Sequence, residues 1–274
     1  MTSRIAAIVL VVVGLVATSV GLGLRVFLPD DDEGHHDGRL PSFALASTSG
    51  TDELTIDQDG DGPTVVVALE RAGQTISDLD EVHGARLHVF AATTGLDRFV
   101  HVDPDVGPDG RSAPITLPAD GTYRLVVQAA PAGGPDLLEL GADVTVSGTD
   151  GAGTDGAGTD GAGTDGAGMD GEAEQNITDD DVWTNGDVTV TRQGFDFVLS
   201  DPVDAPDHHG GPAFITLFRA DDMAFVHGHA QLVEPDRFRF ELAVPGRGDY
   251  LAALQFLPAA DATEPVTALF RFSL

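Results

Sequence analysis

The fold is decided by a stretch that occurs twice, as Pro118-Ala119-Asp120-Gly121-Thr122-Tyr123 and as Pro245-Gly246-Arg247-Gly248-Asp249-Tyr250. In Greek-key β-sandwiches a tyrosine follows a tight turn in this way, and its hydroxyl bonds back to the backbone of that turn. We therefore expect a tyrosine corner in each stretch.

Further matches extend outward from this stretch at nearly constant spacing. At a spacing of 127 residues, Pro118, Gly121, Tyr123, Gln128 and Pro131 are matched by Pro245, Gly248, Tyr250, Gln255 and Pro258. At a spacing of 126 residues, Phe99-Val100-His101 is matched by Phe225-Val226-His227, and His83-Gly84 by His209-Gly210. Two spacings that hold through several matches indicate a duplicated domain.

Each copy consists of short β-rich runs that Gly, Pro and Asp clusters separate at the intervals typical of a sandwich. In the first copy these runs are 65–69, 87–92, 99–102, 115–117, 123–129 and 142–146, and in the second 188–190, 195–199, 213–218, 224–226, 238–244, 250–256 and 266–272. Outside the N-terminus no stretch has the period of an amphipathic helix. The predicted fold is all-β, with two tandem immunoglobulin-like β-sandwich domains behind one N-terminal transmembrane helix.

The N-terminal helix is expected because residues 5–24 carry no charge and are rich in Val, Leu, Ile and Ala. A helix of that length spans about 30 Å, the thickness of the hydrocarbon core of a bilayer. Residues 1–28 are therefore predicted to be an uncleaved anchor, and a cleaved signal peptide is the alternative. Either way the rest of the chain is exported, so we expect a single-pass membrane protein with extracytoplasmic C-terminal domains, or a secreted one.

Two segments lack the apolar side chains that a core needs. Residues 29–53 form an acidic tether, and residues 148–181 form a linker built on four repeats of Gly-Thr-Asp-Gly-Ala. Glycine-rich chains behave as flexible coils, and spaced Asp residues keep them extended. The two sandwiches are accordingly assigned to residues 54–147 and 182–274.

Composition excludes several classes of protein. The chain of 274 residues has a net charge of −31, with 35 Asp, 10 Glu, 14 Arg and no Lys, so it offers no basic surface for nucleic acid. Without Cys there is no disulfide, zinc finger, iron–sulfur cluster or thiol nucleophile. The Asp excess indicates a halophilic source, in which salt screens the self-repulsion of the chain; a codon bias that favours Arg over Lys is the other explanation.

Catalysis is not expected. The sequence has no Gly-x-Ser-x-Gly, no phosphate-binding Gly-Lys-Ser/Thr loop, no His-Glu-x-x-His and no dinucleotide-binding glycine pattern between a strand and a helix. Carboxylate pairs are too numerous in this chain for any one of them to indicate a glycosidase. No catalytic residue and no organic cofactor are predicted.

The histidines are the main candidate metal ligands in this sequence. Alternate residues of a strand share a face, which places His227 with His229, and His101 with Asp103. Further donors are His83, His209 and His88. Imidazole and carboxylate ligands suit zinc or copper(II), whereas a thiolate or thioether copper(I) site is disfavoured because Cys is absent and Met is scarce. The alternative is that these histidines are structural or solvated.

The layout of these residues resembles that of tandem, exported YtkA-like/FixH-like β-sandwich proteins of high-GC bacteria. That family has a His-bearing strand, a Phe/Tyr-x-His-x-His-Pro stretch and a Pro-x-x-Gly-x-Tyr corner. The corresponding segments are Leu87-His88, Phe99-Val100-His101-Val102-Asp103-Pro104 and Phe225-Val226-His227-Gly228-His229-Ala230, followed by the two tyrosine corners. Asp103 and Ala230 depart from the pattern. The resemblance implies heavy-metal or copper handling outside the cytoplasm.

The sequence thus predicts a membrane-anchored extracytoplasmic binding protein that handles divalent copper or zinc through His residues. The alternative is a structural or protein-interaction module of the cell surface without a metal site, as immunoglobulin-like folds often are. The expected partners are the membrane, a divalent metal and an extracytoplasmic protein, and nucleic acid is not among them.

Overall fold

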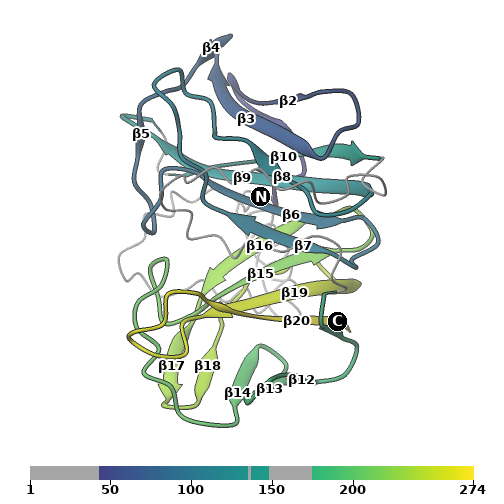
Figure 1. The fold of residues 1–274 in the computed structure, drawn as a ribbon, viewed down its shortest axis with the longest axis vertical. Helices are drawn as coiled ribbons and strands as arrows, with labels where there is room; N and C mark the ends of the chain where they lie inside the picture. The colour runs from purple at the N-terminus through teal and green to yellow at the C-terminus, as the bar shows by residue number, and fades with distance from the viewer. Residues whose placement is uncertain (1–42, 135–136, 148–174) are drawn as a thin grey trace, which may run out of the picture. The chain divides into compact units, whose positions relative to one another are not determined.

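The computed structural model describes residues 43–134, 137–147 and 175–274. Within these ranges all regular structure is β, in twenty strands that form four five-stranded sheets (Figure 1). The predicted all-β class is therefore confirmed for the described part of the chain. In that part no helix has the length and apolar character of a membrane span. The predicted anchor at 1–28 and the pentapeptide repeats lie outside the described residues.

The first copy contains two of the sheets. The first sheet orders β1 (Thr48–Ser49), β2 (Asp52–Gln58), β3 (Thr64–Arg71) and β4 (Gln74–Thr75), and β8 (Ile115–Thr116) also pairs with β3. The second sheet orders β10 (Leu138–Val146), β9 (Gly121–Pro131), β6 (His88–Thr93) and β7 (Phe99–Val102), and β5 (Leu79–Asp80) also pairs with β9. The first strand begins within the 29–53 segment that was expected to be a tether.

The second copy contains the other two sheets. The third sheet orders β11 (Ile177–Thr178), β20 (Val266–Ser273), β19 (Asp249–Phe256), β15 (Phe214–Arg219) and β16 (Phe225–His229). The fourth orders β12 (Val182–Asn185), β13 (Val188–Gln193), β14 (Asp196–Leu199), β18 (Arg237–Arg239) and β17 (Gln231–Glu234). All of these pairs are antiparallel except the one between β11 and β20.

Strand register repeats between the second and third sheets. In the first copy Phe90 of β6 lies opposite His101 of β7, and in the second Thr216 of β15 lies opposite His227 of β16. The pair of His88 with Gln128 recurs as Phe214 with Gln255. Both relationships follow the spacings found in the sequence, so the internal repeat is a repeat of structure.

Each copy encloses a core between its two sheets. In the first copy Leu54, Val67 and Leu69 of the first sheet pack with Val89, Leu125 and Val127 of the second. In the second copy Val190, Phe197 and Phe238 of the fourth sheet pack with Ile215, Leu217 and Leu254 of the third. Two sheets that bury one face each against the other make a β-sandwich.

A third core lies between the two sandwiches. Because strand side chains alternate, Val89 and Ala91 face the first core while Phe90 and Ala92 face the opposite way. These outward side chains join others from the second and third sheets in one buried cluster, whose aromatic members are Phe90, Phe99, Phe214, Phe218 and Phe225. The second and third sheets are thus buried on both faces, which explains why β6 and β15 read as continuous apolar runs.

Both tyrosine corners are present. The hydroxyl of Tyr123 donates to the carbonyl of Ala119 at 3.0 Å, and that of Tyr250 donates to the carbonyl of Gly246 at 2.6 Å. Each ring is fully buried. The prediction for these stretches is confirmed.

The predicted strand at 238–244 is wrong in extent. Strand β18 ends at Arg239, and residues 240–244 pair with no other described strand. Sequence reasoning also missed β2, β12 and β17, which carry Asp, Gln and Asn among few apolar residues. These strands lie in the first and fourth sheets, which the described residues do not cover on both faces, so one apolar face suffices for them.

Candidate metal centre

Two equivalent turns present the first pair of candidate ligand histidines. His83 and Gly84 have φ of 51° and 90°, and His209 and Gly210 have φ of 56° and 87°. Each pair is closed by a backbone hydrogen bond, from Ala85 N to Val82 O at 3.1 Å and from His208 N to Gly211 O at 2.7 Å. Two consecutive positive φ angles define a type I′ turn, which explains the glycine in both copies.

Two equivalent strands present the second set. His227 and His229 lie on β16 with Phe225, and their side chains follow that of Phe225 onto the face that meets the other sandwich. His101 and Asp103 take the same positions at β7, after Phe99. The predicted sharing of a face within each pair is consistent with ring centroids of His227 and His229 that are 5.0 Å apart.

The first cluster consists of His83, His227 and His229, and is called the tri-imidazole cluster below. Each residue offers one ring nitrogen, and these three nitrogens all lie within 4.8 Å of one another. The ring centroids of His83 and His229 are 4.3 Å apart. His83 comes from the first copy and the other two come from the second, so the cluster exists only because the two sandwiches are packed together.

All three imidazoles favour the neutral form. Burial lowers the pKa of His83, with a smaller effect from the charge of His88. Burial, together with its His229 neighbour, lowers the pKa of His227 well below its usual value. Burial lowers the pKa of His229 to about 4. Neutral imidazole is the form that binds a metal ion, so the cluster is ready for coordination near neutral pH.

Two ring nitrogens of the tri-imidazole cluster differ in their hydrogen bonding. The Nε2 atom of His229 is buried and has no hydrogen-bond partner among the described residues. Buried polar atoms nearly always have a partner, so this atom calls for an explanation. On His227 the Nδ1 atom lies 3.4 Å from the hydroxyl of Thr216, a residue that sequence reasoning missed. The sequence feature that could have indicated Thr216 is its hydroxyl inside the apolar run 214–218, and in the strand register Thr216 lies opposite His227.

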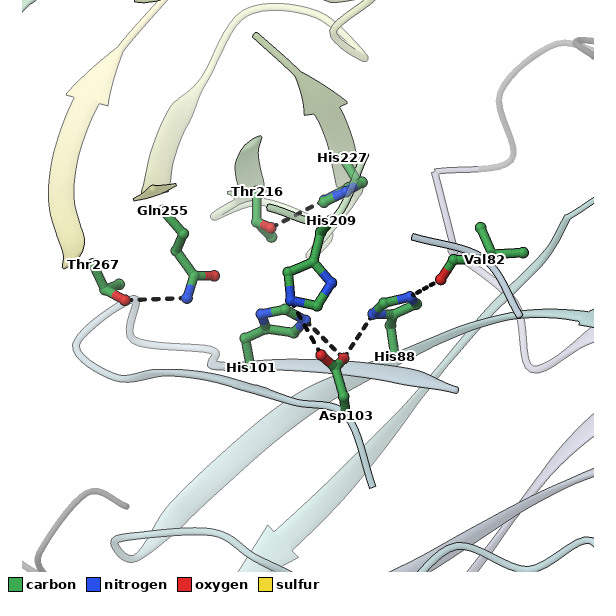
Figure 2. A network of polar contacts seen from close by, with 9 residues as sticks. All are labelled: Val82, His88, His101, Asp103, His209, Thr216, His227, Gln255 and Thr267. Carbon is green, nitrogen blue, oxygen red and sulfur yellow. Dashed lines mark hydrogen bonds and ion pairs between the residues drawn. The ribbon is translucent and has the colours of Figure 1, made fainter. Parts of the chain in front are cut away.

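The second cluster consists of His88, His101, Asp103 and His209, and is called the carboxylate cluster (Figure 2). Asp103 is its centre. Its Oδ1 atom lies 2.6 Å from Nδ1 of His88 and 3.2 Å from Nε2 of His101, and its Oδ2 atom lies 3.3 Å from Nε2 of His209. The contact with His88 has good hydrogen-bond geometry, whereas Nε2 of His101 has no hydrogen bond of acceptable geometry in the described part of the chain.

The surroundings of His88 favour its doubly protonated form. Its Nδ1 faces a carboxylate, and its Nε2 lies 2.8 Å from the carbonyl of Val82, so both nitrogens must donate. Burial lowers the pKa of His88, but the hydrogen bond and charge of Asp103 outweigh it and raise the pKa overall. Burial raises the pKa of Asp103, but its close contacts with the imidazoles of His101 and His88 outweigh burial and hold that pKa far below its usual range.

Burial lowers the pKa of His209 to about 4, against the opposing attraction of Asp103. The carboxylate cluster therefore contains one buried ion pair and two further imidazoles. Removal of one member of such a pair leaves an uncompensated buried charge, which is strongly destabilising.

The structure brings all seven predicted ligand residues into these two clusters. It does so crosswise, because each turn histidine joins the strand residues of the other copy: His83 joins His227 and His229, while His209 joins His101 and Asp103. His88, which has no histidine counterpart in the second copy, belongs to the carboxylate cluster. The pair His35-His36 of the predicted tether lies outside the described residues.

The nitrogen positions of the tri-imidazole cluster are compatible with a tetrahedrally coordinated ion. Metal–nitrogen bonds of about 2.0–2.1 Å place two nitrogens roughly 3.3 Å apart. The three nitrogens lie within 4.8 Å, so small rotations of the rings bring them into range. Three protein ligands leave a fourth position for water or another ligand.

Comparison with known proteins identifies one domain. Residues 48–146 match the model of a domain of unknown function (DUF8832), and this range runs from the first residue of β1 to the last of β10. No curated protein matches the chain. Among solved structures, the chicken CNTN1 FN1–FN3 domains are 10% identical, with a TM-score of 0.23 and with 80% of this chain and 64% of that chain covered. The chain therefore spans less than two thirds of that structure, and so low a TM-score does not establish a shared fold.

Proposed function

We propose that this protein binds one divalent transition-metal ion, zinc or copper(II), at the tri-imidazole cluster. The observation that carries the proposal is the convergence of His83, His227 and His229 from two different domains, with their donor nitrogens within 4.8 Å of one another. Imidazole nitrogen is a ligand that both metals prefer.

The energetic cost of the apo cluster supports the same proposal. Each of the three rings loses hydration, and the Nε2 atom of His229 gains no hydrogen bond in return within the described residues. A buried polar atom without a partner costs about 1–3 kcal/mol. A metal ion would supply the missing partner. Departures from polar satisfaction of this kind are concentrated at functional sites.

The setting of the site follows from the sequence. We propose an extracytoplasmic protein, held by the apolar segment at 1–28 or released from it, whose two sandwiches are immunoglobulin-like. Its acidic composition suits a halophilic environment and attracts cations to its surface. The resemblance to YtkA-like/FixH-like proteins is part of this proposal, as is the absence of catalysis and of nucleic-acid binding.

A structural or protein-interaction module is the second candidate. The observation that favours it is the apolar cluster between the sandwiches, in which Phe90, Phe99 and Phe225 hold the two halves together without any ion. On this view the histidines fill polar positions at the edge of that cluster, and the partner would be another extracytoplasmic protein.

The two candidates differ in metal binding. Isothermal titration of the untagged full chain in mild detergent, with Zn²⁺ and with Cu²⁺, should give saturable binding in the wild type. His229→Ala removes a ligand, whereas loss of an outer-shell partner alone already costs about 10–100-fold in affinity. We therefore expect a loss of about 100-fold or more.

The matched control is a His35→Ala/His36→Ala variant, which removes the only His pair outside both clusters. It should titrate like the wild type. Equal binding by the wild type and His229→Ala, or binding that disappears in the control, would leave the structural module as the function.

A further inference from the structure

The carboxylate cluster has a set of metal donors of its own. His88, His101 and Asp103 each offer one donor atom, and these three atoms all lie within 4.8 Å of one another. The Oδ1 atom of Asp103 lies 3.2 Å from Nε2 of His101, and its Oδ2 atom lies 3.3 Å from Nε2 of His209. Ligands of a tetrahedral ion with bonds of about 2.0–2.2 Å lie roughly 3.3 Å apart. Both contacts therefore already have the spacing of two ligands of one ion.

The Nε2 atom of His101 lacks a partner at this point. The atom is buried, the side chain is only 6% exposed, and no hydrogen bond of acceptable geometry reaches the atom from the described residues. It nevertheless lies 3.2 Å from Oδ1 of Asp103. Two ligands of one ion lie this close together while each points at the ion rather than at the other. A metal ion would give this buried atom the partner that such atoms nearly always have.

His88 is oriented as a metal ligand is. Its Nε2 atom donates to the carbonyl of Val82 at 2.8 Å, and its Nδ1 atom faces Asp103 (Figure 2). Metal-binding histidines commonly donate their other ring N–H to a backbone carbonyl in this way. The carbonyl of Val82 holds the ring whether a proton or a metal ion lies at Nδ1, and an ion that binds there releases the proton. The distance of 2.6 Å between Nδ1 and Oδ1 must then widen by about 0.7 Å.

The carboxylate of Asp103 supplies the negative charge that the tri-imidazole cluster lacks. Its side chain is 13% exposed, and each of its ion pairs in the described part of the chain is with an imidazole. Buried charges are stable where they are paired or coordinate a metal ion. Imidazole nitrogen together with carboxylate oxygen is a ligand set for zinc, and four protein ligands make a closed tetrahedral site.

We propose that the carboxylate cluster is a second zinc site, separate from the tri-imidazole cluster. Its four protein ligands are His88, His101, Asp103 and His209. The two sites share no ligand, so this proposal does not depend on the proposed function. They also differ in kind, because three imidazoles leave one position open to water or another ligand, whereas four protein ligands close the site and hold the ion as a structural element.

The test is the stoichiometry of Zn²⁺ on the untagged full chain in mild detergent, measured by titration and by elemental analysis after dialysis. The wild type should hold two equivalents. His101→Gln and His227→Gln are matched variants at equivalent positions of the two copies, and each should lose one equivalent, while the double variant should hold none. Asp103→Asn keeps the size of the side chain, removes its charge and should also lose one. The His35→Ala/His36→Ala control should keep two.

Circular dichroism and cooperative unfolding show whether each variant is folded. A second measurement needs no variant: NMR of the histidine ring nitrogens in the wild type, with and without Zn²⁺. Zinc should shift the signals of Nδ1 of His88, Nε2 of His101 and Nε2 of His209. If a variant does not fold, these signals decide whether the second site exists.

The outcomes separate the two sites. One equivalent in the wild type that a folded His101→Gln variant keeps, or a ring nitrogen of His101 that zinc does not shift, would overturn the second site and leave the proposed function intact. One equivalent that His101→Gln loses and His227→Gln keeps would support the second site and remove the tri-imidazole site. No binding by the wild type would remove both.

Discussion

A Cβ atom added to Gly210 would lie 2.6 Å from Cδ2 of His83, so the turn of one copy packs directly against the imidazole that the turn of the other copy presents. Gly84, at the equivalent position, has nothing within 4 Å of such an atom. Both glycines have nearly the same positive φ, 87° and 90°. Substitution of Gly84 and of Gly210 in turn therefore distinguishes the effect of backbone strain from the effect of displacing His83.

Gly210→Ala should weaken Zn²⁺ binding by about tenfold or more, because His83 must move away from the other two imidazoles. Gly84→Ala carries the same strain of about 1–2 kcal/mol but should bind as the wild type does. Titration with Zn²⁺ and urea unfolding of the two variants measure both effects. An equal loss of affinity in both would mean that His83 does not contribute to the site.

Metal-free protein should lose stability in acid. The pKa values of His209 and His229 fall from 6.5 in the unfolded chain to about 4 in the folded one. Between these values the unfolded chain binds more protons, so the free energy of unfolding rises with pH. Each of these two histidines should therefore lower the free energy of unfolding by about 2 kcal/mol as the pH falls from about 7 to about 5.

The lowered pKa values of His83 and His227 add to this loss in the same direction. His88 acts the opposite way: its raised pKa gives a stabilisation that is complete below pH 6.5 and is lost as the pH rises through the folded value. Urea unfolding with EDTA, at a series of pH values, measures the sum of these contributions to the free energy of unfolding. A free energy of unfolding that is flat or rises toward acid would contradict these environments.

The interface between the sandwiches should contribute as much to the free energy of unfolding as a domain core does. Phe225 is fully buried there, with ring centroids of Phe90 and Phe218 at 5.2 and 5.4 Å. Phe225→Ala should cost about 3–5 kcal/mol and split a single unfolding transition into two, because the halves lose their coupling. Phe256→Ala, in the core of the second sandwich, should cost a similar amount without splitting it. A loss below about 1 kcal/mol at Phe225 would show that the interface is weak.

The tyrosine corners give a test at two equivalent sites. Tyr123→Phe and Tyr250→Phe each remove one hydroxyl that bonds the carbonyl of Ala119 or Gly246. Because the rings stay packed, each change should cost about 1 kcal/mol of unfolding free energy in urea. Additive losses in the double variant are expected of distant sites. No measurable loss in either would mean that water replaces the hydroxyl.

Salt should stabilise the folded chain. A net charge of −31 repels itself in the compact state, and counter-ions screen that repulsion. The midpoint of thermal unfolding should therefore rise as KCl increases from about 0.1 M to about 2 M. Sucrose that raises the midpoint as much as KCl does, at equal osmolality, would point to solute exclusion rather than to screening.

Much of the fold could be predicted because its signals are local. Tyr123 and Tyr250 marked the corners, and β6, β7, β15 and β16 were visible as short β-rich runs. Phe90, Phe99 and Phe225 lie in those runs and are buried, but the sequence could not say in which core. Period-two alternation tells which residues share a face and not which sheet that face meets.

The candidate site was predictable as a set of residues and not as two clusters. Spacing placed His227 beside His229 and His101 beside Asp103, since neighbours on a strand obey a local rule. Crosswise assembly depends on how two sandwiches pack, for which the chain offers no local signal. The doubly protonated state of His88 depends likewise on the carbonyl of Val82, a backbone atom that no residue pattern reveals.

Because the tri-imidazole cluster is divided between the two halves, the proposed metal binding would be linked to domain docking. An ion bound by His83 on one side and by His227 and His229 on the other holds the halves together, and any force that separates them must also release the ion. This coupling is reciprocal by thermodynamic necessity. Metal occupancy would then report whether the two halves are docked, and a partner that separates them would cause the ion to be released.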